Sequence, residues 1–261
     1  MSNICLQIQN KDGEIIQQAI GQDEVNLVYR NEYQEGDQVV LEVEEVDSFY
    51  YVQFDDAKGK SLVYLKGNVE YTIPFGEKRI NTSAKVFYGD RHVLSVRKAM
   101  DEEIRNYRNL SENVWDQHGD VNCYPHASAN VETRGESVFA ALNAIDGVTV
   151  SESHGQWPYE SWGINRRDDA AWKLEFGRPV EIEKLVIYTR ADFPHDNWWE
   201  KATVTFSDGT KEVLDLKKGG KAQVFNIHKN NIEWLELSDL IKADDPSPFP
   251  ALTQLQVYGR G

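Results

Sequence analysis

The chain has 261 residues, a length that exceeds one ordinary domain of about 100–150 residues. Of these residues, 40% are hydrophobic and 11% are aromatic. Seven tryptophans and twelve tyrosines exclude a disordered chain, and the short apolar runs exclude membrane spans, which need about 20 apolar residues. A net charge of −15 repels phosphate groups, so we expect no nucleic-acid partner and no membrane partner.

The two cysteines, Cys5 and Cys123, lie in different halves of the chain and in no zinc-binding or redox spacing, so we expect free thiols. Residues 1–13 alternate apolar and polar side chains. A secretory signal has a basic start followed by an apolar core, so this pattern predicts a cytoplasmic protein.

Short extended runs separated by turn residues fill the first part of the chain. They cover residues 4–8, 39–46, 49–54, 61–65, 71–75, 84–88 and 92–96. This spacing predicts an antiparallel β-sandwich domain over residues 1–98.

The pattern changes after this region. Apolar residues recur every three or four residues, with charged residues between them, at Met100, Ile104, Tyr107, Leu110 and Val114. This periodicity predicts one amphipathic helix from residue 96 to about residue 117, and we place a helical linker at 99–121.

Strand patterns return in the second half, at residues 172–176, 182–189, 202–206, 211–216, 222–227, 232–237 and 252–258. The segment 128–171 before them has little strand pattern, and an irregular segment of that length is usually functional. The sequence therefore predicts an all-β fold with two β-sandwich domains joined by one helix.

Several motifs of the second half occur in the order and spacing of a known family. They are Ala144-Ile-Asp-Gly147, Trp162, Trp172-Lys-Leu-Glu-Phe-Gly177, the strand at 182–190, Phe206-Ser-Asp-Gly209 and Leu255-Gln-Val-Tyr-Gly259. Residues 122–261 resemble the discoidin or coagulation factor V/VIII type C domain, a group that includes the family 32 carbohydrate-binding modules. The resemblance implies a galactose-binding-like jelly roll whose loops at one end bind a ligand, often a sugar. The first half resembles no family that we recognise.

The resemblance also implies one structural calcium ion beside the Asp-Gly loop, where Asp146 and neighbouring carbonyls would suit a hard cation. Members of the family usually have a glutamate in the last strand, where this chain has Gln254. The alternatives are a calcium site at Asp146 and a plain turn that requires no cofactor.

The densest cluster of aromatic and charged side chains lies in the loop after residue 189. It contains Arg190, Asp192, His195, Trp198 and Trp199. Adjacent residues of a strand face opposite sides, so one of the two tryptophans is expected outside the core, where its flat ring would stack on a sugar. The alternatives are a core position for each tryptophan and a structural ion pair between Arg190 and a neighbouring aspartate.

A second cluster contains His154, Trp157 and Arg166, and Arg166 is followed by Arg167 and two aspartates, Asp168 and Asp169. Paired arginines are an exception in so acidic a chain, and planar guanidinium groups suit the carboxylate of an acidic sugar such as a uronate. Neutralisation of the pair by the two aspartates is the alternative. The proline-rich loop 242–250 is expected to be rigid, as one wall of a binding rim or as a plain connection.

These loops predict a carbohydrate-binding protein with a saccharide ligand, with acidic saccharides included. A second class is an intracellular hydrolase or lyase on oligosaccharides with a site between the domains, which convergence of His126, His154 and His195 on one cleft would favour. Motifs of nucleotide-binding proteins, zinc peptidases and serine hydrolases are absent, which favours binding over catalysis. A third class is a protein-interaction module or homo-oligomer that uses the same aromatic surface.

Overall fold

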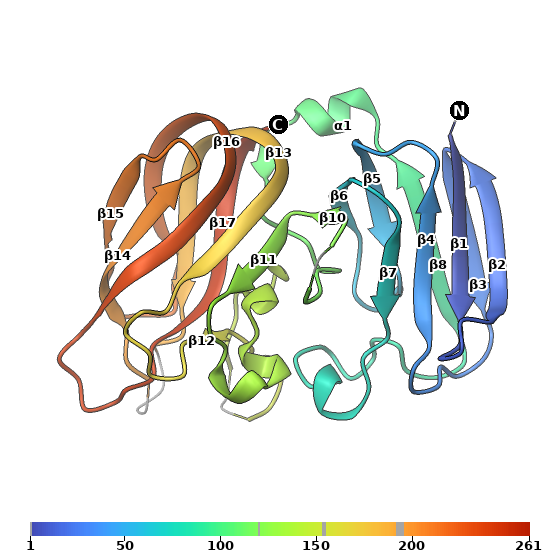
Figure 1. Ribbon diagram of the computed structural model, residues 1–261. Coiled ribbons are helices and arrows are strands. Elements are labelled where there is room, and N and C mark those ends of the chain that lie inside the picture. Colours follow the sequence, from blue (N-terminus) through green and yellow to red (C-terminus); the bar gives the residue numbers. More distant parts are fainter. Residues whose placement is uncertain (1, 120, 153–154, 192–195) are drawn as a thin grey trace.

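The computed structural model describes residues 2–119, 121–152, 155–191 and 196–261, and the regular structure in these residues is nearly all β-strand. Two β-sandwiches lie side by side, and a linker with short strands fills the space between them (Figure 1). The predicted all-β fold is therefore confirmed. In the described ranges, every helix is too short or too polar to cross a bilayer. Both cysteines are free, as predicted.

Two antiparallel sheets form the N-terminal sandwich, with strand orders β2-β1-β4-β7 and β10-β6-β5-β8-β3. The strands of the first sheet are β1 (Asn3–Gln9), β2 (Ile15–Gln22), β4 (Gln38–Val43) and β7 (Val69–Thr72). Those of the second are β3 (Glu24–Tyr29), β5 (Ser48–Gln53), β6 (Ser61–Leu65), β8 (His92–Lys98) and β10 (Cys123–Tyr124). Alternate residues such as Ile4 and Leu6 face inward and are fully buried, so the core forms between the two sheets.

This sandwich differs from the sequence prediction in two places. The strands β2 and β3 were not predicted, and β2 exposes apolar residues such as Ile20. Residues 84–88, predicted as a strand, belong to a loop between β7 and β8 in which η1 (Gly76–Arg79) is a 3-10 helix. Val86 and Phe87 pack into the core from this loop, which explains the apolar pattern.

The linker contains one short helix in place of the long helix that the periodicity predicts. The helix α1 spans Asp101–Arg105, and the two-residue strand β9 (Arg108–Asn109) follows. The apolar residues of the expected helix face do not share a face, because Leu110 is buried in the C-terminal core whereas Val114 packs against the N-terminal core, in which the next residue, Trp115, is buried. The linker is therefore attached to both sandwiches.

Asparagine side chains explain why the helix ends early. The side-chain oxygen of Asn109 accepts a hydrogen bond from the backbone N–H of Ser111 at 3.2 Å, and that of Asn113 accepts one from Trp115 at 3.1 Å. Such local side-chain contacts offer the backbone an alternative to helical hydrogen bonds.

The C-terminal sandwich is built on long strands that bend, with the order β12-β17-β13-β16-β14-β15. The strands are β11 (His126–Ala129), β12 (Trp162–Gly163), β13 (Trp172–Thr189), β14 (Trp199–Phe206), β15 (Lys211–Asp215), β16 (Gln223–Lys242) and β17 (Ala251–Arg260). The register of β13 against β16 shifts between Glu175 and Lys184, and such irregularities let one strand serve both faces. Trp172, predicted to lie in the core, is fully buried there.

Three short 3-10 helices lie in the segment between β11 and β12. They are η2 (Thr133–Gly135), η3 (Ser137–Phe139) and η4 (Ala141–Ile145). This arrangement agrees with the predicted jelly roll and places the loops after η2, β12, β13 and β16 at one end of the sandwich (Figure 1).

Backbone pairing joins the two sandwiches. The strand β10 pairs with β6 of the N-terminal sandwich, and β11, which follows directly, pairs with β13 of the C-terminal one. Gly177 in β13 has φ +72°, and a Cβ atom there would lie 2.5 Å from the ring of Tyr124, so only glycine permits this approach. The segment 123–129 thus belongs to both sandwiches, and the predicted boundary at residue 122 falls at its start.

Candidate functional site

A narrow slot of about 120 Å³ opens at the loop end of the C-terminal sandwich. Its lining residues are Thr133, Arg134, Phe139, Gly163, Ile164, Asn165, Arg166, Arg190, Pro248, Phe249, Pro250 and Ala251. Three of these are arginines and none is acidic, although the whole chain has a net charge of −15. Arg134 donates two hydrogen bonds to Glu136, at 2.6 and 2.7 Å, and Arg190 pairs with Asp196, so Arg166 is the arginine of the slot that could receive a negative or hydrogen-bond-accepting group.

Arg166, predicted to bind ligand, lies at the slot with its guanidinium carbon 4.7 Å from the centre of the Phe249 ring. A tight turn holds it there: Asn165 and Arg166 have φ values of 47° and 63°, and the Arg167 N–H donates to the Ile164 carbonyl at 2.9 Å. Left-handed backbone at residues other than glycine costs about 1–3 kcal/mol, and such outliers cluster at ligand sites.

The aspartates that follow Arg166 are used elsewhere. Arg167 donates two hydrogen bonds to Asp169, at 2.8 and 2.6 Å, and Lys242 pairs with Asp168 at 2.8 Å. The neutralisation alternative therefore holds for Arg167. Within the described ranges, no ion pair engages the guanidinium of Arg166.

Arg190 also lines the slot, but its side chain is only 4% exposed. It forms the structural ion pair considered above, with Nη2 at 3.3 Å from the buried carboxylate of Asp196, and Nη1 donates to the Tyr159 carbonyl at 3.2 Å. Among the described residues, its buried Nε has no hydrogen-bond partner. A buried donor without an acceptor is rare, and it marks a place where a ligand or water oxygen would be stabilised.

The predicted tryptophans do not line the slot. Trp199 is fully buried, with its ring centre 6.2 Å from that of Trp162, so the prediction that it stacks on a sugar is wrong: the alternation of β14 turns it into the core. Trp198 faces the other side and is half-buried, with the Lys218 ammonium 4.7 Å from its ring centre. Trp157 is 42% exposed and contacts none of the slot.

Two phenylalanines supply the aromatic surface that the sequence analysis assigned to tryptophans. Phe249 is 37% exposed between two prolines, so the proline-rich loop forms one wall of the slot. The guanidinium carbons of Arg134 and Arg190 each lie 5.6 Å from the centre of the Phe139 ring. A phenylalanine fixed between two prolines was the signal available in the sequence.

Three predicted ligand-binding residues, His154, Asp192 and His195, lie outside the described residues. The convergence of His126, His154 and His195 on one cleft, which would favour an enzyme, therefore also involves residues outside the described ranges.

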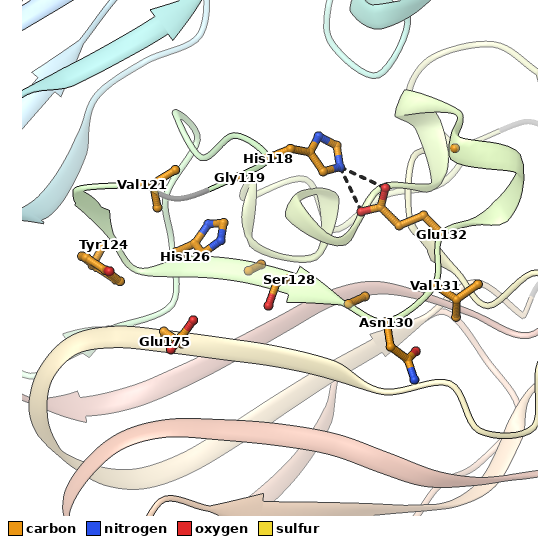
Figure 2. Close-up of a pocket in the computed structure, with 13 residues that line it drawn as sticks. His118, Gly119, Val121, Tyr124, His126, Ser128, Asn130, Val131, Glu132 and Glu175 are labelled. Atoms are coloured by element: carbon orange, nitrogen blue, oxygen red, sulfur yellow. Dashed lines mark hydrogen bonds and ion pairs between the residues drawn. The ribbon is translucent and has the colours of Figure 1, made fainter.

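A larger groove, of about 820 Å³, lies beside β11 where the linker meets the C-terminal sandwich (Figure 2). Two imidazoles in it meet carboxylates. His126 Nδ1 lies 2.7 Å from a carboxylate oxygen of the buried Asp116, and His118 Nε2 lies 2.9 Å from one of Glu132. Glu175 lines the same groove.

The pair of His126 and Asp116 is buried beneath the groove. Burial lowers the pKa of His126, but the hydrogen bond and charge of Asp116 outweigh it and raise this pKa overall. Burial raises the pKa of Asp116, whose second oxygen accepts the Ala127 N–H at 2.8 Å. Both oxygens of this carboxylate are therefore occupied by groups of the protein itself.

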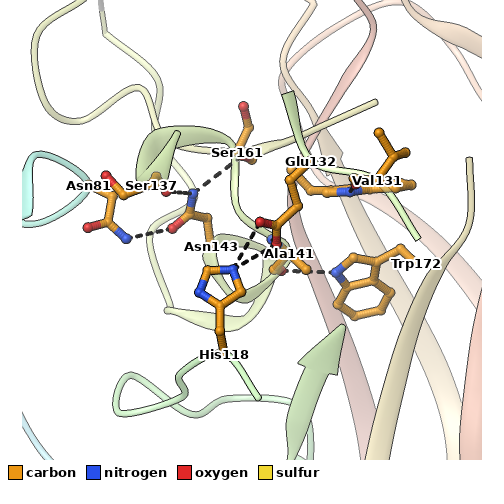
Figure 3. Close-up of polar contacts among 10 residues, drawn as sticks. Asn81, His118, Val131, Glu132, Ser137, Ala141, Asn143, Ser161 and Trp172 are labelled. Carbon is orange, nitrogen blue, oxygen red and sulfur yellow. Dashed lines mark hydrogen bonds and ion pairs between the residues drawn. The ribbon is translucent and has the colours of Figure 1, made fainter. Parts of the chain in front are cut away.

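The pair of His118 and Glu132 connects the linker to the core (Figure 3). Glu132 also accepts the Ala141 N–H at 2.7 Å, and the Ala141 carbonyl accepts the indole N–H of Trp172 at 2.9 Å. The hydrogen bond that His118 donates to Glu132 raises the pKa of His118. Burial raises the pKa of Glu132, but hydrogen bonds from His118 and Ala141 outweigh it and lower this pKa overall. We interpret both pairs of the groove as structural.

Gln254 closes the loop at Asp146, where the resemblance implies calcium. Its Nε2 donates to the Asn143 carbonyl and to Asp146 Oδ1, both at 2.6 Å, and its Oε1 accepts the Gly147 N–H at 3.3 Å. A calcium ion needs oxygen ligands, whereas an amide NH₂ group faces these two oxygens. The residues present at this loop therefore do not fit the implied calcium ion.

Comparison with protein families and curated proteins gives one match. A family model described as a domain of unknown function, DUF7402, matches residues 122–243. No curated protein matches the chain at a significant level.

Similar solved structures include a chitosan-binding module of a chitosanase/glucanase from Paenibacillus sp. IK-5, which is 15% identical to this chain. The match covers 58% of this chain and 99% of that module, with a TM-score of 0.40. A fucose-binding module from Streptococcus pneumoniae has 14% identity, 59% and 99% coverage and a TM-score of 0.41. The family 32 module of C. perfringens NanJ, solved with galactose, has 16% identity, 51% and 91% coverage and a TM-score of 0.38. Modules of the group that residues 122–261 resemble are thus among the structures to which this chain is similar.

Proposed function

We propose that the loop end of the C-terminal sandwich binds a saccharide that carries an anionic group. The observation that carries this proposal is Arg166, whose guanidinium lies over the Phe249 ring with no acidic partner in the described ranges, at a slot whose lining contains no acid. A guanidinium held on an aromatic ring and not engaged by an acid keeps N–H groups to donate to a carboxylate.

The other slot residues suit the remaining features of a sugar. The exposed ring of Phe249 and two prolines offer apolar walls for the C–H face of a pyranose. A volume of about 120 Å³ equals roughly four water molecules, so the slot accommodates one sugar unit at most.

The test is titration calorimetry of the full chain against two oligosaccharide panels of equal length, one neutral and one containing uronate units. We expect heat with the uronate panel and weaker binding at high salt, because salt screens the contact with Arg166. Equal binding of both panels would leave a saccharide site but remove the anionic group from the proposal. Binding of neither panel would overturn the proposal.

The alternative of an enzyme with a site in the groove predicts a different result. Hydrolysis or elimination of the same oligosaccharides, lost in a His126→Gln variant, would favour it. The groove supports this alternative less than the slot supports binding, because Asp116 and Glu132 already accept hydrogen bonds from the protein.

A further inference from the structure

The loop between β7 and β8 of the N-terminal sandwich lies against the C-terminal loops (Figure 1). The hydroxyl of Ser137 donates to the Glu77 carbonyl at 2.6 Å, and the side-chain amide of Asn81 donates to Asn143 Oδ1 at 2.9 Å (Figure 3). Ser137 begins η3, the 3-10 helix that ends with the slot residue Phe139. The loop is therefore fixed beside one wall of the slot.

The charge of this loop is opposite to that of the whole chain. Residues 76–91, which we call the basic loop, contain four basic residues, Lys78, Arg79, Lys85 and Arg91, and two acidic ones, Glu77 and Asp90. All of these side chains are exposed except that of Arg79, which is half-buried. In a chain with a net charge of −15, the slot and the basic loop are thus adjacent positive regions.

The basic loop also presents an aromatic ring. Tyr88 is 74% exposed, and the guanidinium carbon of Arg79 lies 5.7 Å from its ring centre. The preceding residues Val86 and Phe87 are buried in the core, and Phe87 has φ 54°, so the backbone at Tyr88 is anchored. The pair of Arg79 and Tyr88 resembles the pair of Arg166 and Phe249 in the slot, since each places a guanidinium over an aromatic ring.

We propose that the ligand is an acidic polysaccharide chain that spans both sandwiches, with one unit in the slot and further units on the basic loop. This inference rests on the function proposed above. The slot holds a single unit, so a longer chain must leave it across the surface, and the basic loop is attached to the wall at η3. Repeated negative charges favour the neighbouring positive surface, and sugar rings suit the exposed Tyr88.

The experiment compares uronate oligosaccharides of two and about eight units in calorimetric titrations of the wild-type chain and of Tyr88→Ala and Lys85→Ala variants. Arg105→Ala is the matched control, because Arg105 is an exposed cation of α1 at the opposite end of the molecule (Figure 1). We expect each loop variant to weaken binding of the long oligosaccharide roughly five- to tenfold, with the disaccharide unaffected.

The outcomes separate this inference from the proposed function. If both lengths bind equally to all variants, the slot functions alone and the inference is wrong while the proposed function stands. If neither length binds the wild-type chain, the proposed function fails as well. Equally tight binding of a single-stranded oligonucleotide of the same charge would overturn the assignment to a polysaccharide.

Discussion

The Arg166 guanidinium lies 4.7 Å from the centre of the Phe249 ring, while its neighbour Arg167 is turned to Asp169. Two adjacent arginines thus have different roles. Arg166→Ala is expected to weaken binding of an acidic oligosaccharide about tenfold or more, because hydrogen bonds to charged groups contribute about 1.5–3 kcal/mol. Arg167→Ala is the control with equal charge loss, and a similar weakening in both variants would show a general charge effect instead.

The buried ion pair of Arg190 and Asp196 makes Arg190 necessary for stability as well as for the proposed site. Arg190→Met is expected to lower the free energy of unfolding by about 3–5 kcal/mol, because it removes the Arg190 partner of a buried ion pair and leaves the Asp196 carboxylate buried. Chemical denaturation measures this change. Adding Asp196→Asn should restore part of the lost stability, and a double variant less stable than Arg190→Met would contradict the explanation.

The sequence predicted the β-sandwiches because strand alternation reports burial directly, as in β5 and β6. It overlooked β3, although the burial of that strand alternates in the same way. It failed for the linker, since the spacing of Leu110 and Val114 suits one helix face although Leu110 lies in the C-terminal core and Val114 packs against the N-terminal one. It failed for Trp199 because the side of a strand that faces the core depends on register, which one sequence does not reveal.

For the candidate site, the sequence identified Arg166 and Arg190, and it offered an ion pair between Arg190 and a neighbouring aspartate as an alternative. It did not identify the partner of Arg166, because the contact of Arg166 with Phe249 joins two loops whose approach is decided by the tertiary fold. Composition can therefore point to residue types in loops, whereas the selection of Phe249 over the tryptophans required the structure.

The stability contributed by His118 and Glu132 is expected to depend on pH. The pKa of His118 is raised above its ordinary value of 6.5, so its contribution is complete below about pH 6.5 and is lost as the pH rises through the raised pKa. The pKa of Glu132 is lowered below 4.5, so its contribution is lost as the pH falls through that lowered value. The pair should therefore contribute most between about pH 4.5 and 6.5.

The measurement is the difference in unfolding free energy between the wild-type chain and His118→Ala from pH 4 to 9. We expect a difference below about 1 kcal/mol, because the His118 side chain is 64% exposed and water screens the pair. The difference in unfolding free energy between the wild-type chain and His118→Ala should shrink toward pH 9. A difference that grows with rising pH would contradict the assignment of a charged pair.

Leu110 and Trp115 give a way to separate the two cores. Leu110→Ala is expected to destabilise the C-terminal sandwich by about 2–5 kcal/mol, and Trp115→Ala the N-terminal one by about 3–5 kcal/mol, because each leaves a cavity. Hydrogen exchange of the two sandwiches reports where protection is lost. Loss in both sandwiches from either variant would show that they unfold as one unit, whereas loss confined to one would show separate cooperative units.

Gln254 offers the sharpest test of how the Asp146 loop is held together. Its amide donates to the Asn143 carbonyl and the Asp146 carboxylate, so calcium is expected to leave the thermal unfolding of the wild-type chain unchanged. Gln254→Glu replaces the amide donor with a carboxylate that faces the same oxygens. Without calcium this variant should be less stable than the wild-type chain, because the Asp146 carboxylate, whose pKa burial and Glu160 already raise, would face a further negative charge. Calcium should then stabilise the Gln254→Glu variant, by about 2.7 kcal/mol at a hundredfold excess over its Kd.

The control is Gln254→Ala, which supplies neither donor nor ligand and should not respond to calcium. Stabilisation of the wild-type chain by calcium would mean that Gln254 turns its oxygen to the ion, and the amide closure would be wrong.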